Sequence, residues 1–392
     1  MIAADEEGTV AELGEFGLIA ALSQWLPRDP RALVGIGDDA AVLAAPDGRV
    51  VATTDFLLEG RHFRRDWSSA TDVGRKAAAR SLADIAAMGA VPTGLLVALA
   101  VPGELPVSWA RDLAAGLAAE CARAGAAVIG GDTARAASVL LAVTGLGDLA
   151  GRAPVRRSGA APGDLVAVAG PLGHAAAGLA LLSAGLYLPG GATPFSRGNP
   201  SPRTPLGDPP DPRGKPFPPG PLRLIAAHLR PAPPYDAGPE ASDLGATAMI
   251  DVSDGLLADL GHVAAASGVL IDVASARLRP GEPLLAAARA VAAARRHPGP
   301  PPLPPSLSRT DRGTPASHPD SQPGEGPAAE ARRWVLTGGE DHSLAATFPP
   351  GVSLPSRWMV IGEVRQGHGV LVDGRPWPGS PGWDHFAAGI SG

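Results

Sequence analysis

Residues 126–133 read Ala-Ala-Val-Ile-Gly-Gly-Asp-Thr, an apolar run that leads into paired glycines, an aspartate and a threonine. The apolar run predicts a buried strand over 126–129, because it is short and ends at glycine. We expect the two glycines to form a turn. A helix is predicted before the strand, over 109–124, and a second strand after it, over 138–146. This alternation of helices and strands favours an α/β fold.

The same alternation extends along the chain in both directions. Further strands are predicted over 49–54, 95–101, 165–169, 247–252 and 343–348, and further helices over 70–88, 174–184, 222–229 and 254–267. A chain of 392 residues is also too long for a single hydrophobic core. We therefore predict two domains of the α/β (α+β) class.

The predicted boundaries follow the changes in composition. The N-terminal domain covers 14–151 after a tail over 1–13, and the C-terminal domain covers 152–386 before a tail over 387–392. Two insertions in the C-terminal domain, at about 189–221 and 298–327, hold about half of the 43 prolines. Because these insertions lack apolar periodicity, we expect them to be exposed loops rather than parts of a core.

Composition excludes several classes of protein. The net charge of -6 favours neither nucleic acid nor an anionic membrane as a partner. The one cysteine, Cys121, excludes a disulfide framework, and its apolar surroundings predict a buried helical thiol. The apolar stretch over 165–188 is interrupted by Pro171 and His174, which favours a strand, a turn and a helix over a membrane span. The acidic N-terminus is the opposite of a signal peptide, so we expect a cytoplasmic protein.

Six clusters of acidic residues indicate the chemistry of a functional site. Each has a carboxylate beside glycine or a hydroxyl residue, mostly near an expected strand end, and they lie at 35–39, 53–55, 81–84, 130–133, 251–255 and 338–341. A single such Asp is usually a turn former or a helix cap. Six clusters gathered together would repel one another unless cations compensated them. Oxygen ligands favour Mg²⁺, which commonly completes its coordination with phosphate oxygens.

The sequence has no Gly-x-x-x-x-Gly-Lys-Ser/Thr loop and no protein-kinase signature, so any ATP must be held through metals. Several individual residues keep two interpretations. Ser253 either caps a helix or binds a ligand. The arginines at 152, 156 and 157 either lie in a solvated linker or include one that reaches a triphosphate. His62 is either structural or part of a site beside the Thr53–Asp55 cluster.

Taken in order, the strings resemble the thiamine-monophosphate kinase family, within the superfamily of aminoimidazole ribonucleotide synthetase and selenophosphate synthetase. The matching strings lie at 14–19, 35–40, 53–55, 62–63, 81–89, 129–133, 157–164, 230–231, 251–260, 338–341 and 382–386. The resemblance implies an aminoimidazole ribonucleotide synthetase-like fold and a homodimer whose N-terminal domains share a β-barrel. It also implies transfer of the γ-phosphoryl group of ATP to thiamine monophosphate, giving thiamine diphosphate, with several Mg²⁺ ions.

The resemblance assigns roles residue by residue. Magnesium ligands are expected at Asp38, Thr53, Thr54, Asp55, Asp84, Asp132, Asp251 and Asp254, of which Asp55, Asp132 and Asp251 are expected to be catalytic. ATP contacts are expected at Gly131, Asp132, Arg157 and Ser253, and substrate contacts at His62, Glu340 and Trp383. One departure is His342, where the family more often has an aromatic residue.

Two other functions remain as alternatives. One is another ATP-dependent synthetase of the superfamily, although selenophosphate synthetase is excluded because it needs a reactive cysteine or selenocysteine near its N-terminus. The other is a catalytically silent regulator that binds nucleotide or metal.

Overall fold

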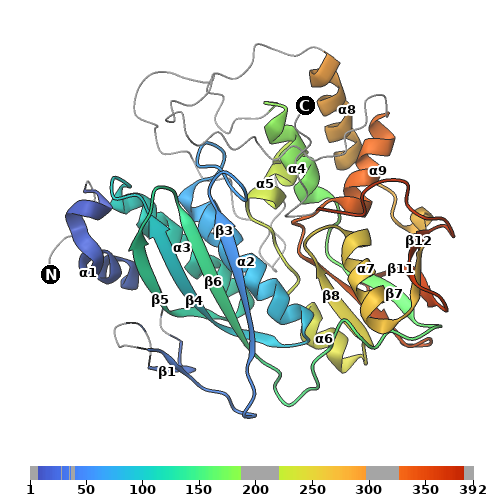
Figure 1. Cartoon of the computed structure of the whole chain (residues 1–392), viewed down its shortest axis with the longest axis horizontal. Helices are drawn as coiled ribbons and strands as arrows, with labels where there is room; N and C mark the ends of the chain where they lie inside the picture. The colour runs from blue at the N-terminus through green and yellow to red at the C-terminus, as the bar shows by residue number, and fades with distance from the viewer. Residues whose placement is uncertain are drawn as a thin grey trace. The chain divides into compact units, whose positions relative to one another are not determined.

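The computed structural model describes residues 8–27, 29–34, 36, 40–186, 220–296 and 326–383. Contacts divide the chain into two compact units, Met1–Arg156 with Pro233–Ala246, and Arg157–Ala232 with Thr247–Gly392. Each unit combines a β-sheet with helices (Figure 1), which confirms the predicted α/β class. The limits of the two predicted domains stay a prediction. Most of both proline-rich insertions lies outside the described residues.

The first unit is built on a four-stranded sheet. Its order is β3 (Val51–Leu58), β6 (Leu140–Asp148), β4 (Val91–Val101) and β5 (Ala127–Arg135). The pairs β3–β6 and β6–β4 are antiparallel, whereas β4–β5 is parallel. Helices α2 (Ala70–Ala87) and α3 (Val107–Ala124) both lie behind the sheet in the view of Figure 1. The unit also contains α1 (Val10–Ser23), β1 (Ala32–Val34), β2 (Val42–Leu43) and α6 (Ala237–Asp243).

Helix α2 is buried along most of its length. It begins with a capping box in which Ser69 and Asp72 exchange side-chain and backbone hydrogen bonds. Its backbone touches that of α3, because a Cβ at Gly74 would lie 2.2 Å from the carbonyl oxygen of Leu113. Glycine at this position therefore allows α2 and α3 to pack backbone against backbone. Cys121 is buried in α3, as predicted.

A buried ion pair joins α2 to α3 in the first unit. Arg75 Nε lies 3.1 Å from Glu120 Oε2, and the two side chains are 4% and 0% exposed. The hydroxyl of Tyr235, from the segment Pro233–Ala246, donates to Glu120 Oε1 at 2.8 Å. Burial raises the pKa of the Tyr235 phenol well above its usual range, so the hydroxyl stays a donor. One carboxylate thus connects three segments that are distant in sequence.

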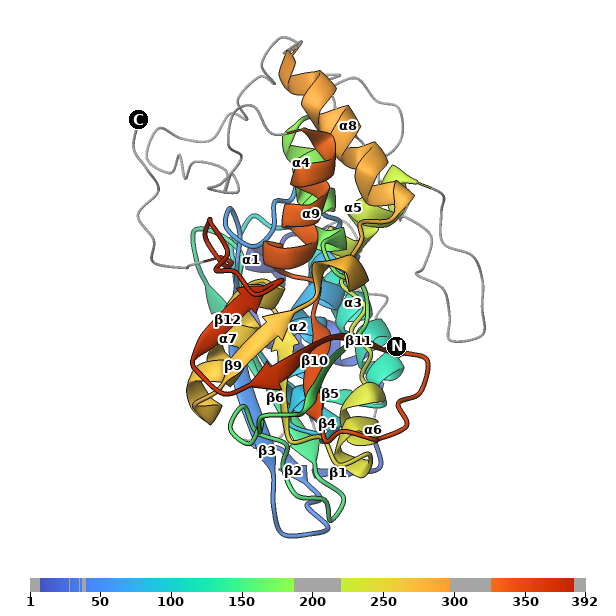
Figure 2. The ribbon, with the colours of Figure 1, turned by 90° about the vertical axis from the view of Figure 1, so that its right-hand side faces the viewer.

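The second unit is built on a six-stranded sheet. Its order is β12 (Gly369–Val372), β9 (Leu270–Val273), β11 (Trp358–Arg365), β7 (Leu165–Ala169), β10 (Ser343–Phe348) and β8 (Ala248–Val252). All neighbours are antiparallel except β12 and β9. Figure 2 shows α4 (His174–Ser183), α5 (Pro221–Leu229), α8 (Glu282–Arg296) and α9 (Pro327–Thr337) grouped together. Helix α7 (Leu256–Ser267) packs on β8, β9 and β12, and the short η1 (Ser275–Arg277) contacts β11.

Several predicted elements are confirmed, and two features are corrected. The strands over 165–169 and 343–348 match β7 and β10. The turn expected at Gly130 and Gly131 is wrong, because β5 runs through both glycines. A Cβ at Gly131 would lie 2.0 Å from the carbonyl oxygen of Val97 on β4, so close strand packing requires glycine there. The helix expected from residue 254 begins at Leu256.

Among the described helices, none combines the length and the apolar character that crossing a membrane requires.

Candidate active site

In the first unit, β3 and α2 bring three of the expected magnesium ligands together. Thr53 Oγ1 donates to Asp84 Oδ2 at 2.7 Å, and Ser81 Oγ donates to Asp55 Oδ2 at 2.9 Å. Thr53 and Asp55 share a face of β3 because they are two residues apart, and α2 covers that face. The expected placement at a strand end is wrong for Asp55, which lies inside β3, whereas Asp84 lies in the helix predicted over 70–88.

The donors of this group suit a hard cation. All of them are carboxylate or hydroxyl oxygens, the ligand type that Mg²⁺ prefers. One cationic group is near, since Arg80 Nη2 lies 3.9 Å from Asp55 Oδ1. Within the described ranges, no three His, Cys, Asp or Glu side chains stand close enough together to hold one ion. Asp38, another expected ligand, lies outside the described residues.

Thr54 and Asp132 lie on the other face of the same sheet. Thr54 follows Thr53 and therefore points away from α2, where its hydroxyl lies 3.2 Å from that of Thr144. Asp132 pairs in register with Ala98, whose row continues across β6 to Phe56. That row is one residue beyond the row of Asp55, so the two carboxylates face opposite ways. Asp132 lies inside β5, and its expected strand-end position is also wrong.

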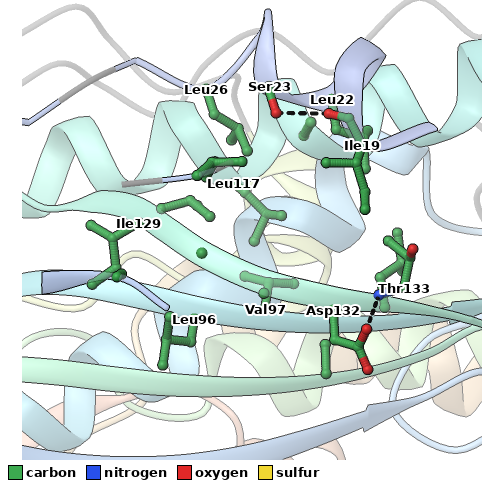
Figure 3. Close-up of a pocket in the computed structure, with 18 of the residues that line it drawn as sticks. Ile19, Leu22, Ser23, Leu26, Leu96, Val97, Leu117, Ile129, Asp132 and Thr133 are labelled. Carbon is green, nitrogen blue, oxygen red and sulfur yellow. Dashed lines mark hydrogen bonds between the residues drawn. The ribbon is translucent and has the colours of Figure 1, made fainter. Parts of the chain in front are cut away.

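A cavity of about 840 Å³ opens beside β5 in the first unit (Figure 3). Its walls are mainly aliphatic side chains of α1, α3, β4 and β5, including Ile19, Leu22 and Leu117. Its polar groups belong to Ser23, the segment 130–133 and Thr144. Asp132 Oδ1 accepts a hydrogen bond from the Thr133 amide at 2.8 Å. Apolar walls with a few polar groups are typical of sites for small organic ligands.

His62 has a structural role in the first unit. Its Nδ1 accepts a hydrogen bond from the Leu58 amide at 3.0 Å, which fixes the chain just after β3. Its carbonyl oxygen accepts from Lys76 Nζ, also at 3.0 Å. These contacts support the structural interpretation of His62, and its contact with substrate stays a prediction.

In the second unit, five of the expected residues surround the loop 251–255. Asp251 lies near the end of β8, with its side chain 6% exposed, and Ser253 and Asp254 follow it. The Glu340 amide donates to the Ser253 carbonyl oxygen, and the Trp383 amide donates to that of Asp254, both at 2.8 Å. The expected metal, nucleotide and substrate residues of this unit therefore meet at one loop, with Arg157 as the exception.

Asp259 holds this loop, a role that we did not predict. Its Oδ2 accepts from the amides of Ser253, Asp254 and Gly255 at 3.0, 3.1 and 3.1 Å. The capping interpretation of Ser253 is wrong, because Gly255 is the N-cap of α7 and no side chain caps it. Burial, and then the charges of Asp251 and Asp254, raise the pKa of Asp259 to about 8. A carboxylate in the first helical turn was the available signal in the sequence.

Asp341 has a structural role in the second unit. It is buried and accepts hydrogen bonds from the amides of Gly173 and Ala175 at the N-terminus of α4. Burial raises its pKa to about 7. The 338–341 cluster thus contributes Glu340 to the loop and Asp341 to a helix terminus.

Arg157 lies apart from the loop. Its carbonyl oxygen accepts from Ser267 Oγ at 3.1 Å, at the C-terminal end of α7. The loop 251–255 is at the other end of this 12-residue helix, which at 1.5 Å per residue is roughly 18 Å long. Within the second unit, the structure does not bring Arg157 to Ser253.

Comparison with known proteins identifies the class to which this fold belongs. Residues 37–149 match the family described as AIR synthase related protein, N-terminal domain. A thiamine-monophosphate kinase of Mycobacterium tuberculosis is 41% identical over 384 residues, which cover 98% of this chain and 95% of that protein. The chain therefore belongs to the thiamine-monophosphate kinase family, whose members are phosphotransferases.

Solved structures agree with this assignment. The crystal structure of thiamine-monophosphate kinase from Stenotrophomonas maltophilia has a TM-score of 0.65 at 31% identity, covering 91% of this chain and 95% of that one. The structure of AaThiL complexed with AMPPCP and TMP has a TM-score of 0.64 at 29% identity, covering 96% and 98%.

Proposed function

We propose that this protein transfers the γ-phosphoryl group of ATP directly to thiamine monophosphate, giving thiamine diphosphate and ADP, with the help of several Mg²⁺ ions. The observation that carries the proposal is the oxygen-only group of Thr53, Asp55 and Asp84, in a chain without a P-loop. Membership of the kinase family supports the reaction, and the AaThiL complex with AMPPCP and TMP supports the two substrates.

Each of the two units contributes proposed Mg²⁺ ligands. Thr53, Asp55 and Asp84 in the first unit, and Asp251 and Asp254 in the second, would hold Mg²⁺. Bound Mg²⁺ supplies positive charge that compensates the negative charge of the transferred phosphoryl group. Because the acceptor atom is already a phosphate oxygen, the reaction needs orientation more than a protein base.

The remaining assignments belong to the same proposal. We assign Thr54 and Asp132 to further metal ligation, and Gly131, Arg157 and Ser253 to ATP. The cavity beside β5 suits the base of the nucleotide, because its walls are apolar. We assign His62, Glu340 and Trp383 to thiamine monophosphate, with Trp383 stacking on its rings.

A direct assay tests the reaction. Protein incubated with ATP, Mg²⁺ and thiamine monophosphate should yield thiamine diphosphate and ADP in equal amounts, and a chelator should stop the reaction. Both products are measured by chromatography. Turnover with a different acceptor only would contradict the substrate, whereas ATP binding without any turnover would favour the silent regulator.

We further propose that two copies of the chain pair through the sheet face of the first unit that α2 does not cover. Phe56 on β3 points to that face and is 60% exposed. A large exposed aromatic residue on a sheet face is typical of a surface that another chain covers. A second copy is the partner that the family resemblance implies.

A cytoplasmic location also stays a prediction.

Phe56→Glu should convert the dimer to a monomer, because it replaces an exposed aromatic side chain on the proposed interface with a charge. Sedimentation velocity measures the change in mass. Met359→Glu is the matched control, since Met359 is 43% exposed on β11 in the second unit and should leave the dimer intact. A Phe56→Glu protein that sediments like the unchanged protein would exclude this face as the interface.

A further inference from the structure

The turn that precedes β10 has an unusual backbone. Glu340 and His342 have φ values of 70° and 51°, a left-handed conformation that residues other than glycine rarely adopt. The turn is held against the loop 251–255, because the amides of Glu340 and His342 donate to the carbonyl oxygens of Ser253 and Val252. Strained backbone of this kind persists where the surrounding structure enforces it, and it is frequent at functional sites.

This conformation directs the His342 ring to Asp251. The residue is 2% exposed, and its Nδ1 lies 3.1 Å from Asp251 Oδ2. A carboxylate oxygen accepts a hydrogen bond, so Nδ1 carries the hydrogen. Nε2 is also buried, and no described residue offers it a hydrogen-bond partner. The ring therefore acts on Asp251 through Nδ1.

Two other carboxylates of this cluster are engaged by backbone amides. Asp259 is occupied by three loop amides, and Asp341 by the amides at the start of α4. A side chain that fixes Asp251 must bring a donor into a buried, acidic environment, which His342 does.

We propose that His342 is a positioning residue that sets the orientation of the Asp251 carboxylate for a divalent cation. With Oδ2 held by the Nδ1 hydrogen, the carboxylate cannot rotate freely, and Oδ1 is the oxygen left for the cation. Hydrogen bonds to the ligands of a metal commonly orient them in this way. The inference rests on the proposed function, in which Asp251 is a metal ligand.

Four variants separate the donor from the backbone and from packing. His342→Asn keeps a donor at about the position of Nδ1 and tolerates positive φ. His342→Gly suits the backbone but has no donor, and His342→Phe keeps the ring but has no donor. The side-chain amide nitrogen of His342→Gln reaches the position of Nε2 instead, so this variant has a donor in the wrong place. Thermal unfolding of each variant shows that it folds.

The measurement is Mn²⁺ binding without substrates, with free Mn²⁺ followed by electron paramagnetic resonance. His342→Asn should bind Mn²⁺ nearly as the unchanged protein does. The Gly, Phe and Gln variants should lose about 10- to 100-fold in affinity at one site, the usual effect of removing such a partner. Asp251→Asn should weaken the same site, and adding His342→Gly to it should have no further effect, because the two residues act as one.

The outcomes distinguish the two levels of the proposal. Unchanged protein that binds no Mn²⁺ would overturn the metal site itself, and the role of His342 with it. Normal Mn²⁺ binding by folded His342→Gly and His342→Gln proteins would overturn only the positioning role. Additive losses in the double variant would also contradict that role, since they would indicate independent effects on the fold.

Discussion

Asp132→Asn should abolish formation of thiamine diphosphate while the protein stays folded. Asp132 is exposed on the edge strand β5, so its substitution disturbs no core. Its local hydrogen bond also survives, because the oxygen of Asn can accept from the Thr133 amide as Asp132 Oδ1 does. A neutral surface substitution of this kind changes the free energy of unfolding by about 0.5 kcal/mol or less.

The catalytic effect should be far larger, because the amide removes a full negative charge from the proposed metal site. Losing one electrostatic contact to a transition state typically reduces kcat by about 10²- to 10³-fold. Steady-state kinetics and thermal unfolding together measure both effects. Asp112→Asn is the control, since Asp112 lies on α3 in a surface pair with Arg111 and should leave turnover unchanged. Near-normal turnover by Asp132→Asn would remove Asp132 from the proposed site.

Glu120→Ala should cause the largest loss of stability among single substitutions in the first unit. Glu120 is 0% exposed and pairs with both Arg75 and Arg123, and it accepts from the Tyr235 hydroxyl. The substitution leaves the buried guanidinium of Arg75 without this carboxylate. Removing one partner of a buried ion pair costs about 3–5 kcal/mol, because the other charge stays desolvated.

Urea denaturation measures this loss as a change in the free energy of unfolding. The matched control is Glu282→Ala on α8, because the pair of Glu282 with Arg289 is exposed and should contribute less than about 1 kcal/mol. Tyr235→Phe should lie between the two, since it removes one buried hydrogen bond but no charge. Equal effects of Glu120→Ala and Glu282→Ala would contradict a stabilising role for the buried pair.

Local features of the fold could be predicted where the pattern lies within one short segment. The strands β7 and β10 are short apolar runs, and each is buried along nearly its whole length. The sequence did not show whether Gly130 and Gly131 form a turn or continue a strand, because glycine is suited to both a turn and a close approach of two strands. Only the position of Val97 on β4 shows that they continue the strand.

The candidate site shows the same division. The residue types and their order indicated a metal–phosphate chemistry and the kinase family, because carboxylates, hydroxyls and glycines in that order are typical of a site for a hard cation and a phosphate. Their grouping could not be predicted, since it depends on which face of β3 meets α2. The resemblance assigned Glu340 to the substrate and gave Asp341 no role, and only the structure shows that Asp341 holds a helix terminus.

By itself, the sequence determined the family, the α/β class and the absence of a P-loop, because motifs and apolar periodicity are properties of neighbouring residues. Only the tertiary structure decided that Thr53 meets Asp84, that Asp132 lies on the opposite sheet face, and that His342 reaches Asp251. The physical reason is that these contacts join segments tens of residues apart. Strand register and helix packing determine such contacts, and both depend on the whole unit rather than on any local pattern.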